Sequence, residues 1–255
     1  MTNPTIKETA ARLEAAGIEN ARGEAYILNE EFCGDELEKA IERRINREPL
    51  QYIIGKWEFF REEYFVSPDC LIPRSDTEVL VEWLVKNLPQ GASLLDLCTG
   101  SGCIAISTAK NRPDVTALGA DVSEAALSIA RKNALHNSVA CDFVYTDVLC
   151  DSPFSEQFDC ISANPPYITN EAMKTLAPEL AHEPKLALCG GEDGMDFYRA
   201  IIKNFTKNLK VGGCFVFELG YDQHDAAKSL ADANGYKFTE NYDYGGNFRF
   251  AVFRK

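Results

Sequence analysis

The sequence predicts an α/β fold: a seven-stranded, mostly parallel sheet that ends in an antiparallel hairpin, preceded by a small helical domain. From residue 75 onward, strand-sized apolar runs alternate with helical patterns, which is typical of parallel βαβ units. The last two runs follow each other without an intervening helix, and the first fifty residues show helical periodicity only. Together these observations predict the sheet, its terminal hairpin and the helical part.

The N-terminal part predicts three short helices, over residues 5–18, 19–32 and 35–45. Apolar residues recur at helical spacing in each. We expect Asp35 to cap the third helix and Pro49 to stop it. Helices this short gain stability mainly by packing together, so they predict a bundle.

The chain then divides into two further parts. The aromatic stretch "WEFFREEYFVSP" predicts a β-hairpin. We therefore expect a helical bundle over 1–50, a hairpin linker over 51–74 and a main domain over 75–255. Within the main domain the predicted strands are 93–97, 115–121, 141–147, 158–163, 214–219, 236–242 and 247–255, and the predicted helices are 103–112, 123–136, 197–209 and 223–234.

Composition excludes several classes of protein. The 255 residues carry a net charge of −13, which disfavours general nucleic-acid binding. No apolar run is long enough to span a membrane, and the polar N-terminus is unlike a secretory signal. The nine cysteines are scattered and the three histidines isolated, so we expect reduced thiols, no metal site and a cytoplasmic location. We also expect a monomer.

The segment "LLDLCTGSGCIAI" predicts a cofactor site. Asp96 ends a strand, Gly100 and Gly102 form a turn that lets backbone approach a ligand, and Asp121 ends the next strand, where it can accept hydrogen bonds from ribose hydroxyls. A plain structural turn and a dinucleotide site are the alternatives. Because the G-x-G-x-x-G series is incomplete and an acid precedes the turn, a cationic ligand, S-adenosylmethionine, is favoured. The predicted cofactor-binding residues are Asp96, Cys98, Thr99, Gly100, Ser101, Gly102, Asp121, Asp147, Val148 and Asn164.

The segment "CISANPPYITN" predicts the reacting end of the site. Pro165 and Pro166 cannot continue a central strand, and they fix a corner after Asn164. The Asn164 side-chain carbonyl and the Pro165 backbone carbonyl are then two adjacent acceptors for a planar –NH2 group. Tyr167 can lie against the flat face of that group's carrier. An ordinary Pro-Pro turn is the alternative interpretation.

These motifs resemble those of methyltransferases that alkylate amide or exocyclic nitrogens through an N-P-P-Y corner, and specifically the release factor glutamine methyltransferases (the PrmC or HemK family). The resemblance covers "EPLQYIIGKWEFF", "FVSPDCLIPRSDTEVLVEW", "LLDLCTGSGCIAI", "NPPYI", "HEPKLALCGGEDGMDFYR", "FELG" and "DYGGNFRF". It departs from the family pattern at Cys98, which replaces a glycine, at Ser75 and at His182. Cys98 is small enough to fit the turn if its φ is negative, whereas a position that requires a positive φ would lower cofactor affinity.

The resemblance implies a Rossmann-like methyltransferase sheet and an enzyme that methylates the glutamine of the Gly-Gly-Gln motif in class 1 peptide chain release factors, in support of translation termination. It implies S-adenosyl-L-methionine as donor, S-adenosyl-L-homocysteine as product and no metal. Asn164, Pro165, Pro166 and Tyr167 would be the catalytic and substrate-binding residues. Apart from the resemblance, the long irregular segment between Tyr167 and Asp196 predicts a loop that clamps a protein substrate, with Glu183 and Asp193 as polar contacts; a solvated loop is the alternative. The N-terminal bundle would dock the release factor.

Other functions use the same features. An adenine-N(6) methyltransferase holds a flipped base with a similar corner, but it needs a basic groove and this chain is acidic. Methylation of another protein glutamine is harder to distinguish, because the corner contacts only the amide. A non-catalytic adenosyl-binding or docking protein would not require the Asn-Pro-Pro-Tyr corner.

Overall fold

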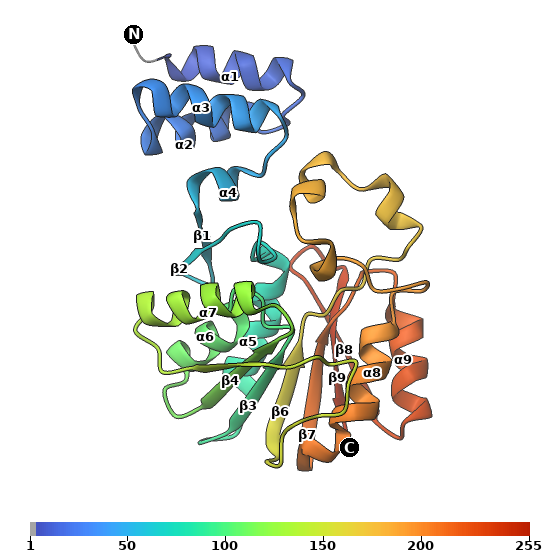
Figure 1. Cartoon of the computed structure of the whole chain (residues 1–255). Coiled ribbons are helices and arrows are strands. Elements are labelled where there is room, and N and C mark those ends of the chain that lie inside the picture. The colour runs from blue at the N-terminus through green and yellow to red at the C-terminus, as the bar shows by residue number, and fades with distance from the viewer. Residues whose placement is uncertain (1–3) are drawn as a thin grey trace.

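The N-terminal helices pack around one another. The computed structural model describes residues 4–255, so residues 1–3 of the predicted bundle lie outside the described part. The helices are α1 (Ile6–Ala15), α2 (Ala21–Glu31) and α3 (Gly34–Ile45). Leu13, Leu28 and Ile41 are fully buried between them, and the bundle lies apart from the sheet (Figure 1).

Two details of this region differ from the sequence-based expectations. Helix α3 begins at Gly34 with Cys33 in the capping position, so Asp35 lies inside the first turn and is not the cap. Its charge there still favours the helix dipole. Pro49 lies beyond the end of α3 and precedes a five-residue helix, α4 (Leu50–Ile54), which the periodicity did not predict. A proline is well suited to the start of a helix because the first N–H groups have no partner there.

A short antiparallel hairpin connects α4 to the rest of the chain. It consists of β1 (Lys56–Phe59) and β2 (Glu62–Phe65), paired from Lys56 opposite Phe65 to Phe59 opposite Glu62. The 3₁₀ turn η1 (Ser75–Thr77) and helix α5 (Glu78–Asn87) follow. Figure 1 shows the hairpin between the bundle and the sheet.

The large sheet has seven strands in the order β5-β4-β3-β6-β7-β9-β8. The strands are β3 (Ser93–Leu97), β4 (Thr116–Asp121), β5 (Asp142–Tyr145), β6 (Phe158–Ala163), β7 (Leu209–Glu218), β8 (Lys237–Tyr242) and β9 (Phe248–Arg254). The first five are parallel, and β9 pairs antiparallel with both β7 and β8. The predicted fold class, including the terminal hairpin and the N-terminal helices, is therefore confirmed.

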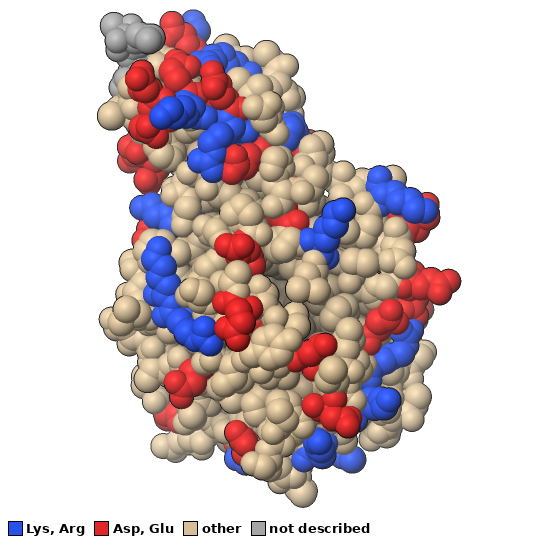
Figure 2. All heavy atoms as spheres, in the orientation of Figure 1, with Lys and Arg blue, Asp and Glu red and all other residues tan. Residues whose placement is uncertain are grey.

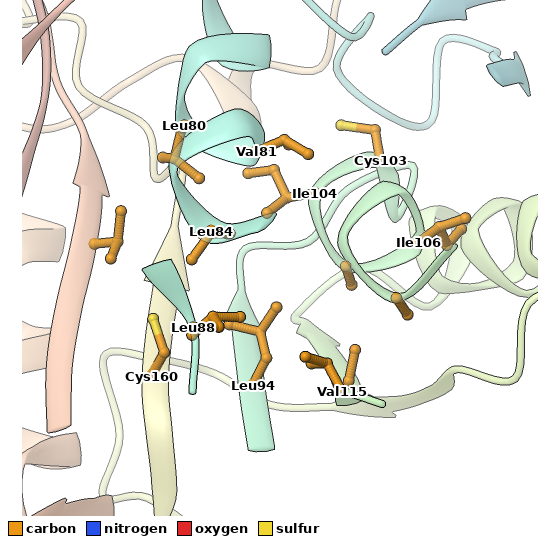
Figure 3. Close-up of a cluster of buried hydrophobic side chains, with 14 of the residues drawn as sticks. Leu80, Val81, Leu84, Leu88, Leu94, Cys103, Ile104, Ile106, Val115 and Cys160 are labelled. Carbon is orange, nitrogen blue, oxygen red and sulfur yellow. The ribbon is translucent and has the colours of Figure 1, made fainter. Parts of the chain in front are cut away.

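Helices cover both faces of the sheet. On one face, α5, α6 (Cys103–Asn111) and α7 (Glu124–His136) bury Leu80, Leu84, Ile104 and other apolar side chains against the strands (Figure 3). On the other face, α8 (Asp196–Phe205) and α9 (His224–Ala233) pack on a cluster that includes Phe217. Because both faces are covered, a ligand site is expected at the carboxyl ends of the strands.

The segment between β6 and α8 runs past that edge of the sheet. It contains three short 3₁₀ turns, η2 (Ala172–Thr175), η3 (Pro178–His182) and η4 (Lys185–Ala187). In Figure 1 this yellow-to-orange segment arches beside the helical bundle. No helix within residues 4–255 has the length and apolar character needed to cross a membrane.

Candidate active site

The loop after β3 folds back tightly on the sheet edge. Its backbone has φ values of +55° at Cys98, +55° at Gly100 and +81° at Gly102. The Thr99 N–H donates to the Ala120 carbonyl at 3.0 Å, which ties the loop to β4. Left-handed φ values suit glycine but strain other residues. The condition under which Cys98 was expected to fit, a negative φ, is therefore not met, and the position has the positive φ that was expected to lower cofactor affinity.

Asp96 lies beneath this loop and is fully buried. Its carboxylate accepts hydrogen bonds from the Thr99 hydroxyl at 2.6 Å and from the Ser162 hydroxyl at 2.7 Å. Burial raises the pKa of Asp96 to about 7, although both hydroxyls favour the ionised form. The carboxylate thus joins the β3 loop to β6, and it lies behind the wall of the neighbouring cavity.

Asp121 connects the same loop to the next helix. Its Oδ2 accepts a hydrogen bond from the Gly100 N–H and its Oδ1 from the Ser123 N–H, both at 2.9 Å. Each carboxylate oxygen has a second lone pair, so the group keeps acceptor capacity toward the cavity that it lines. Ser123 caps α7 through its hydroxyl, which accepts a hydrogen bond from the Ala126 N–H.

A cavity opens where β3, β4, β5 and β6 end. Most of the sequence-predicted site residues line it: Cys98, Thr99, Gly100, Ser101, Asp121, Asp147, Val148, Asn164 and Pro166. Asp96, Gly102, Pro165, Tyr167 and Glu183 are not in its wall. A Cβ added to Gly100 would meet no atom within 4 Å, so bare backbone faces open space there. Bare backbone and three aspartates (Asp69, Asp121 and Asp147) around an apolar cavity fit an adenosyl ligand with cationic groups.

The corner after β6 forms the end of the cavity next to β7. Asn164 is half-buried, Pro165 and Pro166 are buried, and Tyr167 is half-buried. The Asn164 Nδ2 donates to the Thr77 hydroxyl at 3.4 Å. The structure therefore brings Asn164 into the same cavity as the loop residues, although they lie more than sixty residues apart in the sequence.

The glycine-rich segment before α8 supports this corner from outside. The Ile168 N–H donates to the Leu188 carbonyl at 2.9 Å, and the Gly190 N–H donates to the Ile168 carbonyl at 2.8 Å. A Cβ on Gly190 would lie 2.6 Å from the Pro166 carbonyl oxygen. Gly190 is thus needed for the close approach of the two backbones.

Comparisons with known proteins agree with this geometry. The family model for the methyltransferase small domain matches residues 75–193. A release factor glutamine methyltransferase of Thermodesulfovibrio yellowstonii is 41% identical over 225 residues, which cover 84% of this chain and 80% of the relative. One of Moorella thermoacetica is 36% identical over 98% of this chain and 97% of its own length. The chain belongs to the release factor glutamine methyltransferase family.

The fold comparison supports the same class. A methyltransferase from Pyrococcus furiosus superposes with a TM-score of 0.57 at 19% identity, covering 75% of this chain and 88% of that one. A likeness at this identity concerns the fold. The enzyme is thus an S-adenosylmethionine-dependent methyltransferase, with a Rossmann-like sheet whose strand ends form the cavity described above.

Glu183 of this methyltransferase occupies a different place from the one expected of a substrate contact. Its side chain is 1% exposed and forms an ion pair with Arg74. Its Oε2 also accepts a hydrogen bond from the Ile72 N–H at 3.2 Å. The carboxylate therefore holds the segment before η1 against the segment after η3, and direct contact with substrate remains a prediction.

Further residues line the cavity and were not predicted as site residues: Ile72, Thr77, Leu186 and Phe197. Arg74 also lines it, and the sequence suggests this arginine as a cover for the cofactor. Thr77 and Arg74 belong to the "IPRSDTE" segment, which the resemblance included. Leu186 and Phe197 belong to "HEPKLALCGGEDGMDFYR", which the resemblance also included, but no motif marked either side chain as a site residue.

A second hollow adjoins the cavity on the side of the helical bundle. Ile72 and Arg74 line both, and Arg44, Trp57 and Glu179 line the second alone. Two ion pairs connect the bundle to η3 at this hollow: Arg44 and Arg47 contact the Glu179 carboxylate, at 3.2 and 2.8 Å. The bundle is therefore joined directly to the irregular segment above the site.

Neither metal-binding nor disulfide chemistry is built into the described residues. Within residues 4–255, no group of three or more His, Cys, Asp or Glu side chains is arranged to hold a metal ion. The nine cysteines are free thiols.

Proposed function

We propose that this enzyme methylates the side-chain amide nitrogen (N5) of the glutamine in the Gly-Gly-Gln motif of class 1 peptide chain release factors. The methyl group moves from the sulfonium sulfur to the amide nitrogen, the nitrogen then loses one proton, and S-adenosyl-L-homocysteine is left. The reaction supports translation termination. The observation that carries the proposal is the corner after β6, of which Asn164 and Pro166 line the cavity, together with the substrate named for its relatives.

The β3 loop and the two strand-end carboxylates would hold the methyl donor. Gly100 offers bare backbone, Asp121 offers carboxylate oxygens to ribose hydroxyls, and Asp147 with Val148 borders the place for the adenine. When bound, S-adenosylmethionine supplies an electrophilic methyl group on a positively charged sulfur.

The corner would hold the amide that accepts the methyl group. An amide nitrogen is a weak nucleophile because its lone pair is delocalised into the carbonyl. As the nitrogen attacks, it becomes pyramidal and positive, so its two N–H groups become stronger donors. The Asn164 Oδ1 and the Pro165 carbonyl accept from them and stabilise the transition state more than the ground state. Rigid prolines keep both acceptors aligned.

The helical bundle, assigned to residues 1–50, would dock the body of the release factor. Support comes from the second hollow, which adjoins the cavity and is bordered by α2, α3 and η3. A protein that reaches into the cavity with one loop can contact this hollow with flanking residues. The same assignment makes 51–74 the linker and 75–255 the catalytic domain.

The protein would act as a cytoplasmic monomer without general affinity for nucleic acid. The net charge of −13 supports the low affinity for nucleic acid, because non-specific nucleic-acid binding depends on a basic surface. On the face shown in Figure 2, acidic and basic side chains are interspersed and form no continuous basic stripe.

The substrate class is tested by incubating the full chain with radiolabelled S-adenosylmethionine and either a class 1 release factor or DNA. We expect label in the release factor and background counts in DNA. Label in DNA and none in the release factor would instead support an adenine-N(6) methyltransferase.

A further inference from the structure

Glu218, the last residue of β7, is a buried carboxylate directly behind the corner. Ala163 of β6 pairs with Phe217 of β7, so Asn164 and Glu218 follow side by side at the strand ends. Glu218 is 1% exposed. Among the described residues, its Oε2 has no hydrogen-bond partner. A buried acid left partly unpaired is costly, so it calls for a functional explanation.

Two polar side chains lie between this carboxylate and the cavity. Thr77 and Asn164 both interact with the Glu218 carboxylate and lower its pKa, which favours the ionised form. Thr77 is itself 2% exposed, and its hydroxyl also accepts the Asn164 Nδ2 hydrogen bond at 3.4 Å. Glu218, Thr77 and Asn164 thus form one network, and Thr77 and Asn164 also line the cavity.

The direction of hydrogen bonding in this network follows from the carboxylate. An ionised carboxylate can only accept, so the Thr77 hydroxyl and the Asn164 NH2 group must donate toward it. The Asn164 Oδ1 is then left to face the cavity as an acceptor. We propose that Glu218 is a positioning residue that orients the Asn164 side-chain amide, so that its oxygen receives the substrate N–H group.

The same carboxylate strengthens the acceptor as the reaction proceeds. Its negative charge polarises the Asn164 amide through the hydrogen-bonded chain. The polarised Oδ1 then interacts better with the positive charge that develops on the substrate nitrogen. A protonated Glu218 can itself donate, which allows Asn164 to turn its NH2 group toward the cavity and lose the acceptor.

The protonation state of Glu218 changes near neutral pH. Burial raises its pKa to about 7, while Thr77, the Arg249 guanidinium and Asn164 favour ionisation and Asp76 opposes it. Arg249 is shared, since it pairs with Asp76 at 3.0 Å and Asp243 at 3.4 Å. The charged and titratable groups that face Glu218 come from β9, η1, the corner, α8 and α6: Arg249, Asp76, Tyr167, Tyr198 and Cys103.

The test compares Glu218→Gln with Glu62→Gln in the full chain, and it rests on the proposed function for its kinetic part. Glu62 is also a buried acid whose pKa is raised by burial, but it bonds to Ser107 and Asn111, residues outside the cavity wall. With release factor as substrate, we expect Glu218→Gln to lower kcat at pH 8 by about 10- to 100-fold, as for partners that orient a reacting group. The affinity for S-adenosylmethionine should change less than twofold.

The pH profile separates positioning from a structural role. Wild-type and Glu62→Gln proteins should gain kcat as pH rises through about 7, and Glu218→Gln should lack this rise. An unchanged kcat and profile in Glu218→Gln would overturn the proposal, as would an equal loss in Glu62→Gln. If Glu218→Gln does not fold, Thr77→Val and Thr77→Ser are compared instead. Thr77→Val should lose activity and Thr77→Ser should retain activity, and equal activity of these two variants would overturn the proposal.

A readout without substrate distinguishes this proposal from the proposed function. The side-chain NH2 resonances of Asn164, followed by NMR, should titrate near pH 7 in wild type and not in Glu218→Gln. The positioning role would be overturned if the chemical shifts of these resonances did not change with pH in wild type, or if they changed equally in the variant. If they titrate as expected while release factor receives no methyl group, the substrate assignment fails and the positioning role stands.

Discussion

Asn164 is the residue at which the cavity, the end of β6 and the buried Glu218 meet. The corner formed by residues 164–167 offers two hydrogen-bond acceptors to the substrate amide. The Asn164 side-chain oxygen is one of them, and the other is a backbone carbonyl. Its neighbours in the corner act through backbone and shape. Most of the expected catalytic effect should therefore depend on this one side chain.

Asn164→Ala should keep cofactor binding and lose methyl transfer. Removing one group that stabilises transition-state charge typically lowers kcat by about 100-fold or more. The affinity for S-adenosylmethionine, measured by calorimetry, should stay within a few-fold, because the β3 loop is untouched. Asn87→Ala, at an exposed position on α5, is the control and should be fully active. Near-normal turnover of Asn164→Ala would contradict the mechanism.

Cys98→Gly should stabilise the protein and tighten cofactor binding. Cys98 has a φ of +55° in the cofactor loop, and a left-handed conformation costs a non-glycine residue roughly 1–2 kcal/mol. Part of the gain is lost because glycine is more flexible in the unfolded chain, so we expect a net gain of up to about 1 kcal/mol. Cys98→Ala keeps the strain and serves as the control. Equal unfolding free energies for the two variants would refute this explanation.

At the scale of elements, the glycine-rich segment and the corner form one unit. Isolated pairing joins Ile168 to Cys189, and the backbone of Gly190 lies against Pro166 and Tyr167. On the cavity side, the corner is held by the hydrogen bond from Asn164 to Thr77. On the outer side, it is held by the glycine-rich segment. A change in the segment should be transmitted to the reacting end.

Gly190→Ala should lower kcat without removing the cofactor site. Its new Cβ would come 2.6 Å from the Pro166 oxygen and 2.7 Å from the Tyr167 Cα, so the corner must shift. Since small misplacements of reacting groups can cost about 100-fold, we expect a loss of at least tenfold. Gly245→Ala, where the Cβ meets only ends of flexible side chains, is the control. Equal activity of the two variants would contradict the supporting role.

The sequence predicted the elements whose signal is local. Strand β6 lies at 158–163 as expected, because all of its residues except Asp159 are buried. Helix α4 was missed because five residues are too few for periodicity, and β7 begins at Leu209, ahead of the two glycines that hid its start. The cap expected at Asp35 lies two residues earlier, at Cys33, because this helix start has no side-chain cap and its boundary carries no polar capping signal.

The sequence predicted the site residues that belong to a recognisable motif. It did not predict the features that depend on contacts between residues far apart in the sequence. The loop after β3 and the Asn164 corner were expected at one cavity because parallel strands end at the same edge. The φ of Cys98 depends on a turn that one sequence cannot reveal. The importance of Glu218 depends on burial beside Asn164, and "FELG" alone does not show that contact.

At the scale of the whole molecule, folding buries two carboxyl groups of the site, which lowers the stability of the protein when these groups are ionised. Asp96 and Glu218 are both buried, and burial raises the pKa of each to about 7. A carboxyl whose native pKa exceeds its unfolded value, near 4.5 for Glu218, binds more protons when folded. Its stabilising contribution is present below about pH 4.5 and is lost as pH rises through about 7. The enzyme thus gives up stability at neutral pH.

Glu218→Gln should therefore be more stable than wild type at pH 8, while being less active. One pKa unit corresponds to about 1.4 kcal/mol, so the gain from removing the buried charge can reach a few kcal/mol. We expect the Tm difference between variant and wild type to grow from pH 5 to pH 8, reaching about 3 °C or more. Asp96 is present in both proteins, so its effect cancels. A difference that stays constant with pH would show that Glu218 does not titrate in this range.

The most direct test of the account is the chemical position of the transferred methyl group. The full chain is incubated with S-adenosylmethionine and a class 1 release factor, and the product is digested and sequenced by mass spectrometry. The account predicts one methyl group, on the side-chain amide nitrogen of the Gly-Gly-Gln glutamine, and none when Asn164→Ala replaces the wild type. A methyl group on any other atom, or equal methylation by the variant, would contradict it.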